Sequence, residues 1–248
     1  MIILYILIII YIILHVNSSV INNEAEFENL INKDGKEILI NLESTIIFNN
    51  NVIINNNIET LRIYGKSIDL SILKFNDVSH FLNITKTVKE IELKNLSIIG
   101  NVFFENNERI TIENVSYSGT INSNFNENNE YFKISNMQYQ PTSYSLYNCL
   151  ELGGNLEISS SKFYGNSSCL YRLLKFYGNN KYKFKLNDSY FNGEYVCPSL
   201  HIDSALNADI KDSIFENGFD KVEGDGGYIF FFFFFFLINI ICNIKISL

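Results

Sequence analysis

The chain has little positive charge and almost no alanine. Its 248 residues hold 19 Lys and Arg against 27 Asp and Glu, which gives a net charge of −8. Nucleic acids and anionic membranes are bound through basic faces, so this balance argues against both as partners. Alanine is almost absent while Ile, Val, Phe and Tyr dominate, and this composition favours strands over helices.

Metal-binding cysteine patterns and linkers are also absent from the sequence. It has four Cys residues, but neither a Cys-x-x-Cys motif nor a Cys/His spacing typical of zinc occurs. We therefore expect no metal and no other cofactor. No stretch rich in Pro, Gly or Ser divides residues 37–227, which are predicted to form one domain.

What the chain does contain is a repeated phrase, clearest at residues 91–100. Two alternating apolar residues are followed by Asn, another apolar residue and Gly. The copies begin at Ile91, Ile110, Phe132, Leu156, Phe184 and Ala208, which are 19, 22, 24, 28 and 24 residues apart. Such a period, made of short strands and turns, is typical of a solenoid in which each coil buries its apolar face against its neighbours.

Stacked coils turn each position of the phrase into a column of equivalent side chains. In the clearest copy Ile91, Leu93 and Ile98 are predicted to point inward. The fifth position forms an Asn/Asp ladder at a turn, with members Asn95, Asn114, Asn136, Asp188 and Asp212. The tenth position is mostly Gly, which permits the next bend.

Two other architectures compete with a β-coil. Leucine-rich repeats lack support because their Leu consensus and helical return segment are missing, whereas a β-sandwich remains compatible with evenly spaced strands. The in-register Asn and Gly columns favour the coil. We predict an all-β fold, a parallel β-helix, with a short amphipathic capping helix within residues 22–34, where Ala25, Phe27, Leu30 and Ile31 lie near helical spacing.

The pattern resembles right-handed parallel β-helix proteins of the pectate-lyase-like kind. Three segments are also similar to the Phe-x-x-Asn and Gly-Gly-x-Ile elements of polymorphic membrane protein repeats, namely residues 163–166, 176–179 and 226–229. The resemblance covers roughly residues 37–229. It implies a right-handed β-helix and a surface-displayed or secreted protein.

Both ends of the chain differ from the repeat. Residues 1–18 have the length of a secretory signal peptide, although no Lys or Arg precedes the apolar run; an uncleaved anchor is the alternative. The β-helix domain is then expected at residues 19–227. Residues 228–248 form an apolar tail with an unbroken Phe run, read either as a membrane anchor through residues 228–244 or as a gene-model artefact.

The cysteines suggest one disulfide bond. Cys169 and Cys197 each lie thirteen residues after the start of their repeat copy, so they occupy one column in adjacent coils, within the Cα span that a disulfide needs. We predict a Cys169–Cys197 bond. Two stacked thiols in the core are the alternative, and Cys149, about one coil earlier, competes for Cys169. Cys242 in the tail is expected to be unpaired.

Six Asn-x-Ser/Thr acceptors fit the secretory interpretation. Asn166 and Asn187 are the better glycosylation candidates, and Asn83 is a third. Asn95 and Asn114 also match but occupy the turn ladder, where the side chain is expected to be engaged.

Few residues suggest catalysis. The polygalacturonase signatures Asn-Thr-Asp, Asp-Asp and Gly-His-Gly are absent, and none of the three Arg residues sits beside an Asp pair at coil spacing. His201 and Asp203 share one face of a strand, as an acid/base or metal pair or as solvent-facing polar residues. Asp188 and Asp212 stack in adjacent coils as cation ligands or as turn formers. The acidic loop Asp220, Glu223 and Asp225 is expected to be solvated.

Surface aromatic residues suggest a possible ligand. Tyrosines can stack on sugar rings or pack between coils, and the candidates are Tyr144, Tyr147, Tyr171, Tyr177 and Tyr182. No catalytic residue is assigned. We expect a non-enzymatic, secreted or surface-displayed adhesive or wall-associated scaffold with polysaccharide or cell-surface protein partners; the alternative is a carbohydrate-active enzyme or carbohydrate-binding module. A truncated gene product with no function of its own is a third possibility.

Overall fold

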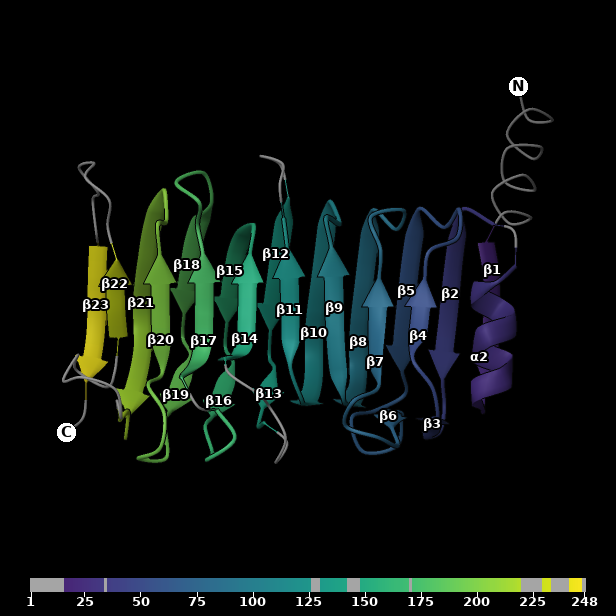
Figure 1. Cartoon of the computed structure of the whole chain (residues 1–248), viewed down its shortest axis with the longest axis horizontal. Coiled ribbons are helices and arrows are strands. Elements are labelled where there is room, and N and C mark those ends of the chain that lie inside the picture. Colours follow the sequence, from purple (N-terminus) through teal and green to yellow (C-terminus); the bar gives the residue numbers. More distant parts are fainter. Residues whose placement is uncertain are drawn as a thin grey trace, which may run out of the picture.

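Strands form where apolar residues alternate with polar ones, as the sequence predicts. The computed structural model describes residues 16–33, 35–125, 130–141, 148–169, 171–219, 229–232 and 241–246. Their strands pair in parallel and wind into a parallel β-solenoid of about eight turns. Figure 1 shows the coils side by side, from β1 and α2 at one end to β22 and β23 at the other. The predicted all-β class and parallel coil are therefore confirmed.

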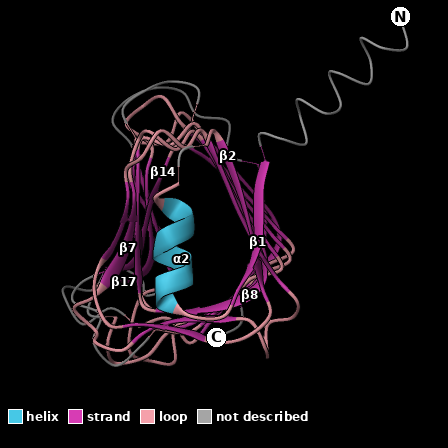
Figure 2. Ribbon diagram, turned by 90° about the vertical axis from the view of Figure 1, so that its right-hand side faces the viewer, coloured by secondary structure: helices cyan, strands magenta, loops and turns pink. Residues whose placement is uncertain are grey.

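Each coil contributes strands to three faces, which surround the core in the view of Figure 2. Face one consists of β1 (Val16–Ile21), β2 (Glu37–Leu42), β5 (Thr60–Gly65), the first halves of β8 (Glu90–Ile99) and β10 (Arg109–Ser118), β12 (Tyr131–Ser135), β15 (Asn155–Ser159), β18 (Lys183–Asn187), and the first halves of β21 (Asn207–Glu216) and β23 (Ile241–Ile246). In β2 every second side chain is buried, as a period of two requires.

Face two continues from face one around a corner within the same sheet. It consists of β3 (Ile46–Phe48), β6 (Ile72–Phe75), the second halves of β8 and β10, β13 (Gln138–Tyr139), β16 (Lys162–Tyr164), β19 (Tyr190–Asn192) and the second halves of β21 and β23. The three ten-residue strands cross the corner without interruption and share one burial pattern.

Face three is a separate eight-stranded sheet. It consists of β4 (Val52–Ile54), β7 (Phe81–Ile84), β9 (Asn101–Glu105), β11 (Ile121–Asn124), β14 (Asn148–Gly153), β17 (Arg172–Tyr177), β20 (Leu200–Asp203) and β22 (Ile229–Phe232). Its strands stay in register from coil to coil, so their outward side chains also form columns.

A single helix lies in the described part of the chain, α2 (Glu24–Ile31), within the predicted range. The side chain of Asn23 caps it by accepting the amide hydrogen of Glu26. Phe27, Leu30 and Ile31 are buried, and Figure 2 shows α2 lying across the end of the coil. Ala25, expected on the apolar side, is exposed. The helix therefore covers core side chains that the first coil would leave in water.

The inward columns fill the solenoid. Ile91, Leu93 and Ile98 are at most 1% exposed, as predicted. In the column of Ile98 later coils place aromatic rings, and Phe163, Phe191 and Phe215 stack with centroid distances of 4.4 and 5.0 Å. Apolar burial along these columns is the main favourable contribution to folding.

The strands at the two ends extend the solenoid beyond the predicted domain of residues 19–227. β1 begins at Val16 and pairs with β2, so Asn17 and Ser18 lie in a strand. In the tail, predicted as a membrane segment or artefact, β22 pairs with β20 and β23 pairs with β21. Among the described residues no helix is long and apolar enough to cross a bilayer. Residues 1–15 and most of the Phe run lie outside the described residues.

Candidate functional site

Face one carries a lattice of opposite charges. The guanidinium of Arg62 contacts the carboxylates of Glu37 and Glu92, and the ammonium of Lys94 lies 3.7 Å from Glu92 and 3.3 Å from Glu113. A second column pairs Arg109 with Glu90 and Lys89 with Glu108. Each of these carboxylates therefore has a Lys or Arg side chain beside it, on its own strand or on a neighbouring coil.

Tyrosines complete that lattice. The hydroxyl of Tyr64 donates to Glu92, and that of Tyr131 donates to Glu157 at 2.7 Å. Burial and then the neighbouring carboxylate raise the pKa of each tyrosine to about 12. Both phenols therefore stay protonated near neutral pH and act as hydrogen-bond donors.

Face three carries a different polar column near its later coils. Asn122, Glu151, Lys175 and His201 occupy paired positions of β11, β14, β17 and β20. Burial, followed by the charges of Arg172 and Lys175, lowers the pKa of His201 to about 4. His201 is therefore neutral at pH 7.

The predicted His201 and Asp203 pair does lie on the outer side of β20. The carboxylate of Asp203 accepts the hydroxyl hydrogen of Ser204 at 2.8 Å. No group of three or more His, Cys, Asp or Glu side chains suited to a metal ion occurs in the described parts of the chain. Asp220, Glu223 and Asp225 lie outside the described residues.

A cleft of about 330 Å³ opens at the carboxyl ends of β11, β14 and β17. Its lining residues are Asn122, Ser123, Asn124, Phe125, Glu151, Gly153, Tyr177, Asn179 and Tyr182. We call it the Gly153 cleft. Of the predicted surface tyrosines, Tyr177 lines the cleft half-buried and Tyr171 is exposed. Tyr182 is fully buried, which agrees with the alternative that these tyrosines pack between coils. Tyr144 and Tyr147 lie outside the described residues.

The predicted turn ladder lies at the corner between faces one and two. Its members have φ angles between 48° and 56°, namely Asn95, Asn114, Asn136, Asp188 and Asp212, and Ser160 fills the missing coil with φ 48°. The Nδ2 of Asn114 donates to Oδ1 of Asn95 at 2.8 Å, and the hydroxyl of Ser160 donates to Asp188 at 2.9 Å. Asn and Asp tolerate this left-handed conformation better than other side chains, which accounts for the column.

A second ladder, of buried serines, was missed by the sequence reasoning. Ser161, Ser189 and Ser213 follow the corner residue in three successive coils, where earlier coils have Leu96, Val115 and Met137. Each hydroxyl donates to the carbonyl two residues earlier and accepts an amide hydrogen from the preceding coil. The signal was available as three pairs, Ser160–Ser161, Asp188–Ser189 and Asp212–Ser213.

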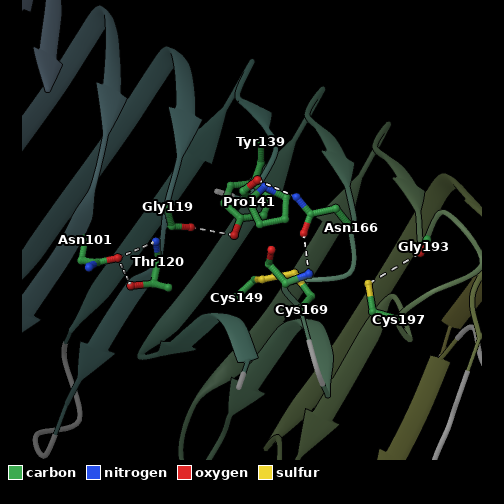
Figure 3. Close-up of a disulfide and its surroundings, with 11 residues drawn as sticks. Asn101, Gly119, Thr120, Tyr139, Pro141, Cys149, Asn166, Cys169, Gly193 and Cys197 are labelled. Carbon is green, nitrogen blue, oxygen red and sulfur yellow. Dashed lines mark hydrogen bonds between the residues drawn. A yellow bond between two sulfur atoms is a disulfide. The ribbon is translucent and has the colours of Figure 1, made fainter. Parts of the chain in front are cut away.

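The predicted Cys169–Cys197 bond is wrong, because Cys169 is bonded to the competitor Cys149 with a Cα separation of 5.5 Å (Figure 3). Cys197 is buried, and its sulfur lies 3.7 Å from the carbonyl oxygen of Gly193. The two turns differ: the amide of Cys169 bonds to Asn166, three residues earlier, whereas that of Cys197 bonds to Gly193, four residues earlier. Cys169 and Cys197 therefore do not occupy equivalent positions in their two coils. Cys242 lies in β23.

The turns also change length around these cysteines. Phe163 pairs with Phe191, 28 residues later, whereas Leu174 pairs with Leu200, 26 residues later. The coil containing Cys197 therefore reaches face three in fewer residues than its predecessor. Two residues that are equally far from the start of their repeats therefore need not occupy the same position in their coils after the turn that follows face two.

Replacing Cys169 by Ser is expected to lower the free energy of unfolding by about 3 kcal/mol, because the bond closes a loop of about twenty residues. Cys197→Ser, which leaves the disulfide intact, is the matched control and is expected to lower the free energy of unfolding by less. Thermal unfolding measures both, and a non-reduced digest should yield a Cys149–Cys169 peptide. Recovery of a Cys169–Cys197 peptide instead would contradict the pairing.

The three glycosylation candidates differ in access. Asn187 is exposed at the end of β18, and its side chain has no hydrogen bond within the described chain. By contrast, Nδ2 of Asn83 donates to Glu105 at 2.8 Å, and Nδ2 of Asn166 donates to the carbonyl oxygen of Pro141 at 2.7 Å. A glycan on either of these two nitrogens would have to displace a hydrogen bond.

The chain matches no known protein-family model, no curated protein and no solved structure. Its fold and the chemistry of its surface are therefore the basis for assigning a function.

Proposed function

We propose that the chain is a non-enzymatic, secreted or cell-surface scaffold, an adhesive or wall-associated protein whose flat faces bind polysaccharide or cell-surface proteins. We also propose that the coil is right-handed, as in pectate-lyase-like β-helices, and that its repeats are related to those of polymorphic membrane proteins. A parallel solenoid suits this role because stacking gives long, rigid faces with side chains at a regular spacing.

The observation that carries the proposal is the pairing of charge on face one. Glycosidases need two carboxylates held at a defined separation on either side of the scissile bond. On face one, Arg62 and Lys94 each stand between two carboxylates, and Tyr64 donates to Glu92 as well. This arrangement favours a stable, hydrated contact surface over an acid/base pair.

The test uses the full chain produced in a eukaryotic secretory host. We expect the protein in the medium, with an N-glycan that Asn187→Gln removes, and binding to wall polysaccharides or to intact cells without release of soluble sugar. Release of oligosaccharides from a pectin-type polysaccharide would instead support the alternative, a carbohydrate-active enzyme. Failure to bind any of these surfaces would refute the scaffold proposal.

A further inference from the structure

The Gly153 cleft exists because one coil contributes no side chains to an outward column. Asn124 ends β11 and Tyr177 ends β17, and between them β14 ends in Gly153, followed by Gly154. Gly154 has φ +79°, a conformation that favours glycine. A Cβ on Gly153 would lie 3.3 Å from the ring of Phe125, which also lines the cleft. The hollow is therefore a property of the fold at this coil.

Its polar lining is made of amides and one carboxylate. The Nδ2 of Asn122 donates to Glu151 Oε2 at 3.1 Å, and this bond orients both groups. The exposed side chains of Asn124 and Asn179 make no hydrogen bond to other described residues. Each such amide presents two donor hydrogens and one acceptor oxygen to a molecule in the cleft.

Its aromatic groups are fixed in place before any ligand arrives. The ammonium of Lys175 lies 4.3 Å from the ring centroid of Tyr177, a cation–π contact. Tyr182 is fully buried, and its hydroxyl donates to the buried Glu130 at 2.7 Å. Side chains that are already immobilised lose little conformational entropy on binding.

We propose that the Gly153 cleft binds one neutral pyranose ring, such as the terminal sugar of an oligosaccharide or glycan. Vicinal hydroxyls match neighbouring amide and carboxylate groups, and the C–H face of the sugar packs on the electron-rich face of a tyrosine. The volume lies at the lower end of the range of about 300–1,000 Å³ for small-molecule sites, which suits a single ring rather than an extended chain.

The charge of the lining selects a neutral sugar over a uronate. Glu151 lines the cleft, whereas Lys175, held over Tyr177, is not among the lining residues. Lys175 lies opposite Glu151 in the strand register, and the ammonium of Lys181 lies 5.7 Å from the ring centroid of Tyr182. A uronate carboxylate would have to compete with Glu151 for these ammonium groups, whereas a neutral sugar would not. This inference rests on the proposed function, since it names one ligand class among the scaffold's partners.

The test is titration of the full chain with cellotetraose, mannotetraose, xylotetraose and tetragalacturonate, followed by calorimetry and saturation-transfer NMR. We expect at least one neutral tetrasaccharide to bind more tightly than tetragalacturonate. Tyr177→Ala is expected to weaken that binding about tenfold, the equivalent of one good contact. Asn124→Ala, an exposed change that leaves the core intact, should weaken it as well.

Tyr195→Ala is the matched control, because Tyr195 is 71% exposed in a turn outside the cleft, and it should leave affinity unchanged. The inference is overturned if no neutral tetrasaccharide binds, if tetragalacturonate binds best, or if Tyr177→Ala and Asn124→Ala both bind as the unaltered chain does. If one of these results is found while the unaltered chain still attaches to wall polysaccharide or cells, the cleft inference falls and the scaffold proposal stands. Loss of all surface attachment in the unaltered chain refutes the scaffold proposal instead.

Discussion

Replacing Phe191 by Ala is expected to lower the free energy of unfolding by about 3–5 kcal/mol. Phe191 is fully buried, with its ring stacked between Phe163 at 4.4 Å and Phe215 at 5.0 Å, the planes within 14° of parallel. Truncation leaves a cavity and removes two ring contacts, each worth about 0.5–1.5 kcal/mol beyond burial. Urea denaturation followed by circular dichroism measures the loss.

The consequences of Phe191→Ala should spread along the solenoid unevenly. Each coil contacts only its neighbours, so the stability of a solenoid is roughly a sum of coil and interface contributions. Hydrogen exchange should accelerate most in β16, β19 and β21, which carry the three stacked rings, and least in β2 and β5. Uniform acceleration along all coils would contradict this nearest-neighbour account.

The control for Phe191→Ala is Tyr195→Ala, an aromatic truncation in the turn that follows β19. Tyr195 is 71% exposed, so its loss should change the free energy of unfolding by no more than about 0.5 kcal/mol. If Phe191→Ala lowers the free energy of unfolding by no more than the control does, the aromatic column does not stabilise the coil.

The repeat predicts which side chains point inward but not how the coil turns its corners. Alternation with a period of two assigns Ile91 and Leu93 to the core, and the strong turn preference of Asn places Asn95 at the bend. Both properties are local, so they can be read from one copy. Leu96, directly after the bend, is also buried, because the left-handed residue shifts the alternation by one.

Features that depend on the path of a whole turn could not be read in the same way. Cys169 and Cys197 are equally far along the chain from the start of their repeats. They lie in turns of different size, because the amide of Cys169 bonds to a carbonyl three residues earlier and that of Cys197 to one four residues earlier. The Gly153 cleft needs Asn124, Gly153 and Tyr177 from three coils in one register. Gly153 and Tyr177 were visible in the sequence, but their alignment depends on the lengths of the turns between them.

The second large effect is expected for Gly119→Ala, at about 3–5 kcal/mol of lost stability. Gly119 has φ +145°, which side chains rarely adopt, and a Cβ there would lie 1.9 Å from the carbonyl oxygen of Gly100. That oxygen also accepts the hydroxyl hydrogen of Tyr117 at 2.8 Å. The amide of Gly100 in turn donates to Ser118 at 2.8 Å, so the obstructing atom belongs to backbone that cannot move without breaking bonds between coils.

Gly153→Ala is the matched control for Gly119→Ala. Its added Cβ would have Phe125 as nearest neighbour at 3.3 Å, and Gly153 lacks the positive φ, so a ring movement of a few tenths of an ångström suffices. We expect the Gly153 variant to unfold near the temperature of the unaltered chain and the Gly119 variant far below it, by thermal unfolding. Equal midpoints for the two variants would mean that the corner between faces two and three tolerates a side chain. Glycine at the tenth position of the repeat would then not be explained by the close approach of the backbones of adjacent coils.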